Sequence, residues 1–109
     1  MSDLPSRGEV WWCDEPFAGG RPVLVLSREE SIPARRRTLI APCTTIVREI
    51  PSQVVLEPGD DPVARTCAVS LDSIQTIPIA LLTERLGRLS IERMHEVCEA
   101  MAAATSCAR

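Results

Sequence analysis

The chain has 109 residues, of which 45% are hydrophobic and 25% are charged, and its formal net charge is −3 at pH 7. These values exclude a disordered chain and predict that residues 1–109 form a single domain with one hydrophobic core. A negative net charge argues against binding nucleic acid across a broad basic surface, so any RNA site must be local.

The N-terminal residues contain no apolar stretch of the kind found in signal peptides. The apolar runs, such as residues 22–26, are much shorter than the roughly 20 residues needed to span a bilayer. Five cysteines without a Cys-x-x-Cys pair favour reduced, buried thiols over a disulfide frame, with Cys107 the most exposed. The sequence therefore predicts a cytoplasmic protein with no membrane segment.

Turn residues divide the first two thirds of the chain into short apolar segments. Residues 9–13 and 22–26 predict two strands joined by a turn at residues 14–20, and the unbroken apolar run of the second strand indicates burial on both faces. The polar segment at residues 28–37 contains a proline and ends in three arginines, so it predicts a surface loop. Further strands are expected at residues 38–43, 53–56, 67–71 and 85–89.

The C-terminal segment has the pattern of an amphipathic helix. Ser90 is a suitable N-cap. Apolar residues then recur at helical spacing, and they predict the buried face of the helix: Ile91, Met94, Val97, Cys98 and Met101. Short strands followed by one helix predict an α+β fold, mostly β, built on a small, curved antiparallel sheet or barrel with a C-terminal helix.

Familiar catalytic and metal-binding patterns are missing from the sequence. His95 is the single histidine, and it has neither a second ligand nor a base partner nearby, so we expect no metal site and no histidine-dependent triad. Trp11 and Trp12 must point to opposite faces of their strand. One therefore enters the core, and the other faces solvent, a partner or a nucleobase.

Three segments resemble the MazF/PemK toxin family, and they occur in the order found in the family. Residues 7–11 (RGEVW) and 20–27 (GRPVLVLS) are similar to the opening strands of the family. Residues 41–45 (APCTT) and 50–56 (IPSQVVL) resemble its P-C-T-T segment and the strand that follows. Residues 67–77 (CAVSLDSIQTI) are similar to the third block, an apolar strand that runs into an acidic residue and an I-x-T-I turn.

This resemblance implies an SH3-like barrel and the toxin of a type II toxin-antitoxin pair. Members are homodimers that bind single-stranded RNA along a groove at the dimer interface. They are sequence-specific, metal-independent endoribonucleases that need no cofactor, and they inhibit translation and growth. The resemblance also implies a cognate antitoxin whose acidic segment occupies the RNA groove.

By the same resemblance, Arg21 and Thr44 match the catalytic residues of the family. RNA supplies its own nucleophile, the 2′-OH, so an enzyme need only align it and stabilise the charged phosphoryl group. Arg21 can bind the non-bridging oxygens through its planar fork, and Thr44 can donate its hydroxyl. Asp72 matches an acidic position that acts as a base or contacts a base edge, and the expected RNA contacts are Ser27, Arg28, Thr45, Arg48, Ser73 and Gln75.

Two further points qualify the assignment. The PemK branch carries a catalytic arginine two residues before the acidic position, and Ser70 stands there in this chain, so the proton-transfer scheme of that branch cannot be transferred. The alternative function is that of a CcdB-like toxin, which binds a topoisomerase and cuts no RNA on the same fold. CcdB-type toxins use a C-terminal Trp-Gly-Ile, whereas this chain ends in Ser-Cys-Ala-Arg.

Overall fold

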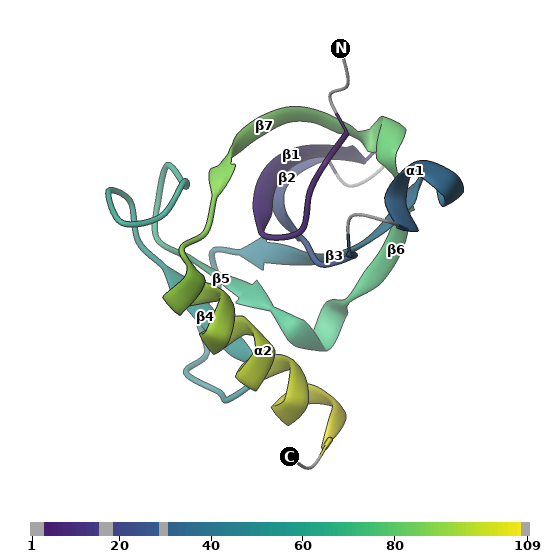
Figure 1. The fold of residues 1–109 in the computed structure, drawn as a ribbon. Helices are drawn as coiled ribbons and strands as arrows, with labels where there is room; N and C mark the ends of the chain where they lie inside the picture. Colours follow the sequence, from purple (N-terminus) through teal and green to yellow (C-terminus); the bar gives the residue numbers. More distant parts are fainter. Residues whose placement is uncertain (1–3, 16–18, 29–30, 108–109) are drawn as a thin grey trace.

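The computed structural model describes residues 4–15, 19–28 and 31–107. Within these residues the chain forms seven strands, two α-helices and two short 3₁₀ helices (Figure 1). In chain order the elements are β1 (Glu9–Glu15), β2 (Gly19–Val25), α1 (Ser31–Arg35), β3 (Arg37–Thr44), β4 (Gln53–Leu56), β5 (Cys67–Ser70), η1 (Leu71–Ser73), β6 (Gln75–Pro78), η2 (Ile79–Leu81), β7 (Leu82–Arg88) and α2 (Ile91–Thr105).

The strands form one strongly curved sheet in the order β4-β5-β3-β2-β1-β7, and β6 pairs with β3 beside this path. All strand pairings are antiparallel. Figure 1 shows the strands bending around a common centre, while α2 lies across one end of the sheet, against β4 and η1. The fold is therefore mostly β with a C-terminal helix, as predicted. The pairings among the described residues leave the sheet open between β4 and β7.

The sequence predicted one hydrophobic core, but the buried residues form two clusters, one on each face of the sheet. Successive side chains of a strand alternate between faces, so β1 contributes Val10 to the core beneath α2 and Trp11 to the core beneath α1. Strand β2 divides in the same way, with Leu24 on one side and Val23 and Val25 on the other. The expected burial of this apolar run on both faces is confirmed.

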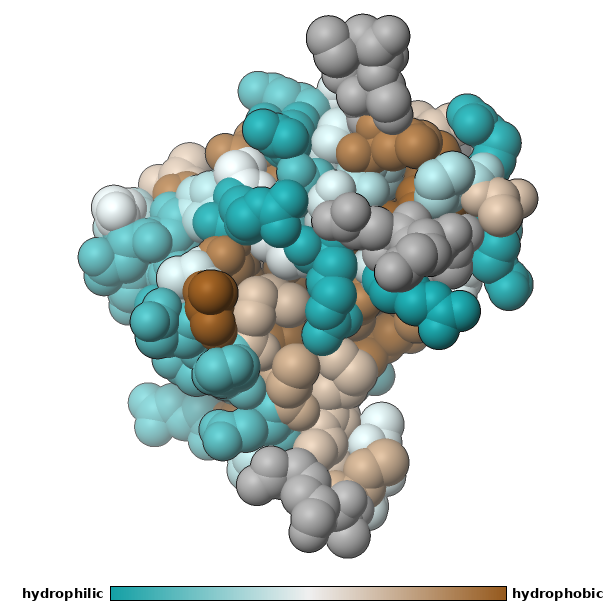
Figure 2. Space-filling view, viewed as in Figure 1, coloured by the Kyte–Doolittle hydropathy of each residue, from teal (hydrophilic) through white to brown (hydrophobic). Residues whose placement is uncertain are grey.

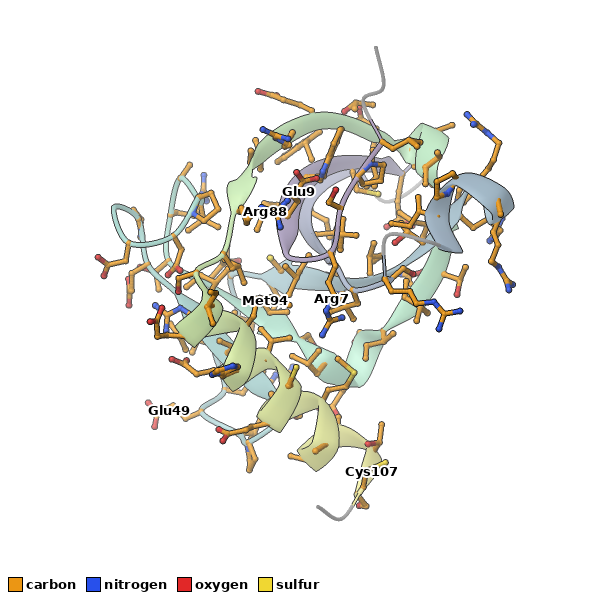
Figure 3. The ribbon with its side chains drawn as sticks, in the orientation of Figure 1. Arg7, Glu9, Glu49, Arg88, Met94 and Cys107 are labelled. Atoms are coloured by element: carbon orange, nitrogen blue, oxygen red, sulfur yellow. The ribbon has the colours of Figure 1, made fainter. Side chains whose placement is uncertain are left out.

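A buried carboxylate joins the first strand to the last. The Glu9 side chain is 2% exposed, and its Oε2 accepts from Arg85 Nη1 at 2.9 Å and from Arg88 Nη2 at 3.4 Å. Its Oε1 accepts from the indole of Trp11 and from the backbone N–H of Ser6. Figure 3 shows Glu9 and Arg88 pointing toward each other between β1 and β7. Because every donor is aimed at one carboxylate, the buried charge is compensated.

Two parts of the strand and loop prediction were wrong. The expected surface loop at residues 28–37 contains helix α1, and its Ile32 is fully buried in the core beneath that helix. Strand β6 was not predicted, and the last strand begins at Leu82, three residues earlier than expected. Residues 16–18 of the expected turn and residues 29–30 of the expected loop lie outside the described part of the chain.

The helix was predicted, and its buried face agrees in part with the expectation, since Val97 is buried and Met94 and Met101 pack against the same core. Ser90 caps α2 by accepting from the backbone N–H of Arg93. The core residues of the helix are Val97 and Ala100, whereas Ile91 is 74% exposed and Cys98 is exposed. The apolar face therefore includes Ala100 in place of Ile91 and Cys98. On the face seen in Figure 2, weakly hydrophobic residues extend along the helix. No helix of the described residues is long and apolar enough to cross a membrane.

Candidate active site

Arg21 and Thr44 come from neighbouring antiparallel strands. Strand β2 pairs with β3 so that Val23 lies opposite Pro42. Extending this register by two residues places Arg21 opposite Thr44, on the same face of the sheet. Residues 23 positions apart in the sequence are thereby brought together at one end of the strand pair.

Arg21 is half-buried, and one N–H donor of its guanidinium has no acceptor among the described residues. Its Nε atom is buried, and no hydrogen-bond partner for it lies among the described residues. A buried donor without a partner costs about 1–3 kcal/mol, so such groups call for an explanation. An anionic ligand bound by the guanidinium fork would supply the missing acceptor.

Thr44 ends β3 with its hydroxyl oxygen already engaged. Oγ1 accepts from the backbone N–H of Ile46 at 3.1 Å. A hydroxyl that accepts one hydrogen bond still has its own proton to donate. The turn at Ile46 therefore fixes the oxygen and leaves the O–H of Thr44 available to a ligand beside Arg21.

Two adjoining clefts share Arg21 and Thr44. The first, called here the tryptophan cleft, has a volume of about 460 Å³ and is lined by Trp12, Gly20, Arg21, Pro22, Cys43, Thr44, Thr45, Val63, Ala64, Arg65 and Cys67. The second, called here the aspartate cleft, has a volume of about 380 Å³ and is lined by Arg21, Pro42, Thr44, Ile46, Arg48, Ile50, Gln53, Ser70, Asp72 and Ser73. Both volumes are typical of small-ligand sites, and together they form a path over the Arg21–Thr44 pair.

In the aspartate cleft, Asp72 lies at the start of η1 and accepts a hydrogen bond from the Ser52 hydroxyl through Oδ2. The backbone N–H of Arg48 donates to Gln53 Oε1 at 2.8 Å, which orders the loop that carries the exposed Arg48 side chain. Ser73 is within 3.5 Å of the Ser70 hydroxyl. A carboxylate, a cation and hydroxyls thus surround the space beside Thr44.

Two buried thiols form the floor of the tryptophan cleft. Cys43 donates to Cys67, and this hydrogen bond together with burial raises the pKa of Cys43. The same hydrogen bond lowers the pKa of Cys67, against the opposing effect of burial. The described structure agrees with the prediction of free cysteines, since Cys13, Cys43 and Cys67 are buried and unpaired. Cys98 differs from the expectation because it is exposed along with Cys107.

Three expected RNA contacts lie outside both clefts. The Ser27 hydroxyl accepts from the backbone N–H of Leu39 at 2.8 Å, and Ser27 and Arg28 line a separate cleft near α1. Gln75 is exposed on β6, where it pairs with Ile40, four positions before Thr44. The structure therefore gathers Arg21, Thr44, Thr45, Arg48, Asp72 and Ser73 at one site and separates Ser27, Arg28 and Gln75 from it.

Arg65 is a cleft residue that the sequence prediction missed. It belongs to the loop between β4 and β5, and it lines the tryptophan cleft together with Trp12 and Arg21. Strand β5 runs antiparallel to β3 with Ala68 opposite Thr44, so the residues that enter β5 lie beside the end of β3. That pairing could not be known before the register was seen.

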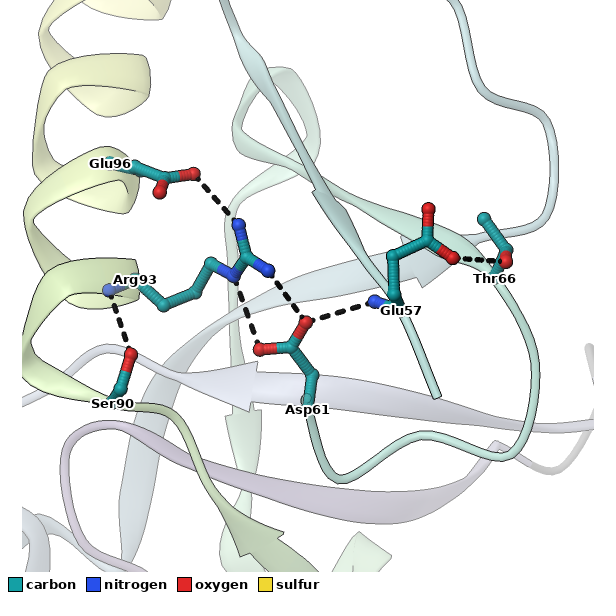
Figure 4. Close-up of polar contacts among 6 residues, drawn as sticks. All are labelled: Glu57, Asp61, Thr66, Ser90, Arg93 and Glu96. Atoms are coloured by element: carbon teal, nitrogen blue, oxygen red, sulfur yellow. Dashed lines mark hydrogen bonds and ion pairs between the residues drawn. The ribbon is translucent and has the colours of Figure 1, made fainter. Parts of the chain in front are cut away.

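The loop that carries Arg65 is fastened to helix α2 by a polar network, drawn in Figure 4. Asp61, whose side chain is 3% exposed, accepts from Arg93 Nη2 at 2.9 Å and from Arg93 Nε at 3.1 Å. It also accepts from the backbone N–H of Glu57, and the Glu57 carboxylate accepts from Thr66. One wall of the tryptophan cleft is thus positioned by the helix.

Among the described residues, no group of three or more His, Cys, Asp or Glu side chains is arranged to hold a metal ion. His95, the single histidine, is exposed on α2. The groups available at the two clefts are arginine cations, hydroxyl donors, one carboxylate and the thiols of Cys43 and Cys67.

Residues 6–105 match the family model described as the PemK-like, MazF-like toxin of type II toxin-antitoxin systems. The chain belongs to this family. Among curated members, it is 53% identical to a probable endoribonuclease MazF5 of Mycobacterium tuberculosis over the full length of both chains. It is 35% identical to a probable endoribonuclease MazF2 of the same species, covering 93% of this chain and 98% of the relative.

Solved structures of the MazF-like family agree with this assignment. An endoribonuclease from a mycobacterial species, solved in complex with its cognate antitoxin, superposes with a TM-score of 0.86 and 28% identity, covering 96% of this chain and 98% of the other. The toxin MazF-mt6 of M. tuberculosis gives a TM-score of 0.84 at 28% identity, covering 93% and 99% of the two chains. The recognition of the family from sequence is confirmed.

Proposed function

We propose that this MazF-like protein is a toxin endoribonuclease that cuts single-stranded RNA at the Arg21–Thr44 pair. The observation that supports the proposal most directly is the unpartnered Nε of Arg21, buried opposite a threonine whose O–H is free to donate. Two converging donors of this kind suit a phosphodiester, which offers two non-bridging oxygens. The family membership and the endoribonuclease relatives support the same conclusion.

The reaction requires no nucleophile from the protein. The ribose 2′-OH loses its proton, its oxygen bonds to phosphorus, and the bond from phosphorus to the 5′-oxygen breaks as that oxygen takes up a proton. The products are a 2′,3′-cyclic phosphate and a 5′-OH end. Arg21 stabilises the charge that develops on the phosphoryl oxygens, since an arginine does not exchange its proton at neutral pH.

The remaining site residues are assigned by their place around this phosphate. Asp72, oriented by Ser52, acts as the base or binds the edge of a nucleobase. Thr45, Arg48 and Ser73 contact RNA within the two clefts. We expect Ser27, Arg28 and Gln75 to contact RNA only farther from the scissile bond, because they lie outside the clefts.

We infer the assembly from the same family. The curved sheet is assigned to the SH3-like barrels, and the chain is a single toxin domain over residues 1–109 that acts in the cytoplasm as a homodimer. A cognate antitoxin is the expected protein partner, and its acidic segment would compete with RNA for Arg21. Neither a cofactor nor a metal ion takes part in the proposed mechanism.

The deciding experiment is cleavage of one long, defined RNA by the purified protein in excess EDTA, with the new 5′ ends mapped and chemically typed. We expect cuts at a short recurring sequence that leave 5′-OH and 2′,3′-cyclic phosphate ends. DNA of the same sequence, and RNA with a 2′-deoxy residue at the scissile nucleotide, should remain intact because they lack the nucleophile.

Thr44→Ala serves as the active-site variant and should cleave at least about 100-fold more slowly, as expected for the loss of one transition-state donor. The control is Thr76→Ala, which removes a surface threonine from β6 and should leave the cleavage rate unchanged. Thr38 is buried, so its replacement would be an unsuitable control. Cleavage of the 2′-deoxy substrate, or loss of activity in EDTA alone, would refute the proposed mechanism.

A further inference from the structure

The indole ring of Trp12 lines the tryptophan cleft, and a hydrogen bond to Asp14 orients it there. Its Nε1 donates to Asp14 Oδ1 at 3.0 Å, and Asp14 Oδ2 in turn accepts from the Thr83 hydroxyl at 3.2 Å. The aspartate therefore links the ring on β1 to strand β7. An aromatic side chain tied in this way loses little conformational freedom when it binds a ligand.

Gly20 leaves room for the ring. A Cβ atom built on Gly20 would lie 2.3 Å from Cζ2 and 2.5 Å from Nε1 of Trp12. No atom of a side chain can approach so closely, so the ring rests directly on the backbone of β2 beside Arg21. The absence of a side chain at Gly20 thus explains how Trp12 reaches the cleft instead of standing away from it.

Trp12 is placed differently from its neighbour in the sequence. Trp11 is 7% exposed, belongs to the core beneath α1, and donates its Nε1 to buried Glu9. Trp12 is half-buried and lines the same cleft as Arg21, Thr44 and Arg65. Of the two, Trp12 therefore has aromatic surface next to the groups that bind phosphate.

We propose that Trp12 stacks on one nucleobase of the RNA, adjacent to the phosphate held by Arg21. This inference rests on the proposed nuclease function and names a residue that positions its substrate. A nucleotide presents a flat π-surface beside an anionic phosphate, and the tryptophan cleft presents an indole beside the guanidinium groups of Arg21 and Arg65. Stacking on the fixed ring would hold the adjacent ribose and its 2′-OH in register with Thr44.

The test measures whether the contribution of Trp12 to RNA affinity depends on the base at one position of the RNA. A short RNA that spans the mapped cleavage site, made uncleavable by a 2′-deoxy residue, is synthesised with an abasic residue at each position in turn, and its Kd is measured by titration. For the wild-type protein, one abasic position next to the scissile phosphate should weaken binding by about 5- to 150-fold, which corresponds to the loss of one base–aromatic stack. In Trp12→Leu the intact RNA should bind more weakly by a similar factor, and that abasic position should cost nothing further.

Trp12→Phe retains an aromatic face and should recover part of the affinity, and it keeps the test valid if Trp12→Leu folds poorly. Gly20→Ala displaces the ring without removing it, so it should weaken binding of the intact RNA and abolish the effect of the same abasic position. Circular dichroism and thermal unfolding confirm that each variant is folded. A structural role for Trp12 would weaken the binding of every oligonucleotide equally.

The protein has two tryptophans, so Trp11→Phe leaves Trp12 as the single indole fluorophore. In this variant, which keeps the cleft residues, the uncleavable RNA should quench the emission and the abasic RNA at the coupled position should not. If the wild type cleaves RNA but no position is coupled to Trp12, the stacking inference is overturned and the nuclease function stands. If the wild type cleaves no RNA, the proposed function fails and the inference fails with it.

Discussion

Arg21 combines a half-buried position with an unpaired donor, and this combination distinguishes it from the other arginines whose contacts are known. Arg85, Arg88 and Arg93 are engaged by carboxylates and have structural roles. The sequence could identify Arg21 only through its resemblance to a family, because an arginine near the start of a strand is ordinarily a solvated charge. The described structure adds one observation in support of the proposed role, the buried Nε of Arg21 without a partner.

Arg21→Lys should reduce the rate of RNA cleavage by at least about 100-fold while the protein stays folded. A lysine keeps the charge but offers a point ammonium in place of two parallel donors, and it has no counterpart of the buried Nε. The rate is measured on an RNA that contains the mapped site. Arg35→Lys, which changes an exposed arginine on α1, serves as the control. Equal rates for wild type and Arg21→Lys would remove the guanidinium fork from the mechanism.

The Cys13 thiol makes the free energy of unfolding depend on pH in the alkaline range. Burial, followed by the charges of Glu15 and Asp14, raises the pKa of the Cys13 thiol above its ordinary value of 9.0. Above that pH the unfolded chain loses the proton first, so the stabilising contribution is present in full below 9.0 and is lost as the pH rises through the folded pKa. The sequence contains neither lysine nor tyrosine, so few other groups titrate in this range.

The free energy of unfolding should therefore decline as the pH rises above 9.0, as measured by urea denaturation at each pH. Cys13→Ala should be less stable at neutral pH, but its decline should be shallower. Cys43, whose pKa is also raised, should add to the decline, and Cys67, whose pKa is lowered, should oppose it. Cys98→Ala, which removes an exposed thiol, serves as the control, and an unchanged slope in Cys13→Ala would contradict the assignment.

At the scale of elements, the strands marked by an apolar run between turn residues were predictable, and a strand without such a run was not. The strand predicted at residues 53–56 has the bounds of β4, because the apolar run Val54–Leu56 lies there between turn-forming segments. Strand β6 has one buried residue, Ile77, in four, and it exists because β3 pairs with it, which a local pattern does not reveal. Helix α1 was missed for a similar reason, since one buried side chain, Ile32, anchors it.

The ion pair between Arg93 on α2 and Asp61 in the loop that carries Arg65 should contribute to stability and to RNA binding. Arg93→Ala leaves the buried Asp61 carboxylate without its cation, and we expect the free energy of unfolding to fall by about 3 kcal/mol. RNA affinity should fall as well, because the loop with Arg65 loses its anchor. Glu96→Ala removes an exposed partner of the same Arg93 and should cost less than about 1 kcal/mol. Equal losses in the two variants, measured by denaturant unfolding, would contradict this account.

At the scale of the whole molecule, a net charge of −3 coexists with a locally cationic site. Arg21, Arg48 and Arg65 line the two clefts, and Asp72 is the acidic residue among the lining side chains described. The composition predicts that any RNA site must be local, and the arginines of the two clefts are consistent with that prediction. The members of that site could not be read from composition, because they come from loops and strand ends that only the register brings together.

The salt dependence of RNA binding should be shallow. With three arginines at the phosphates, the slope of log K against log salt is expected near −2, using about −0.7 per neutralised phosphate on a single strand. The measurement is the Kd of the uncleavable RNA between low and moderate salt. Arg65→Ala should make the slope less steep by about 0.7, whereas Arg36→Ala on the surface should not change it. A wild-type slope steeper than about −4 would indicate a much larger basic surface than these clefts provide.

Because β1 pairs with β7, the sheet can complete its folding only after the last strand has been synthesised. Arg88 reaches Glu9 across 79 residues of sequence, so the sheet cannot be finished until nearly the whole chain has left the ribosome. At roughly 5–20 residues per second, synthesis leaves β1 without its second neighbour for seconds, and closing so long a loop is itself slow. Ribosome-bound chains that stop at Leu81 should be digested by protease where released full-length chains resist. A nuclease assembled in this order would spare the message that encodes it until translation of that copy has ended.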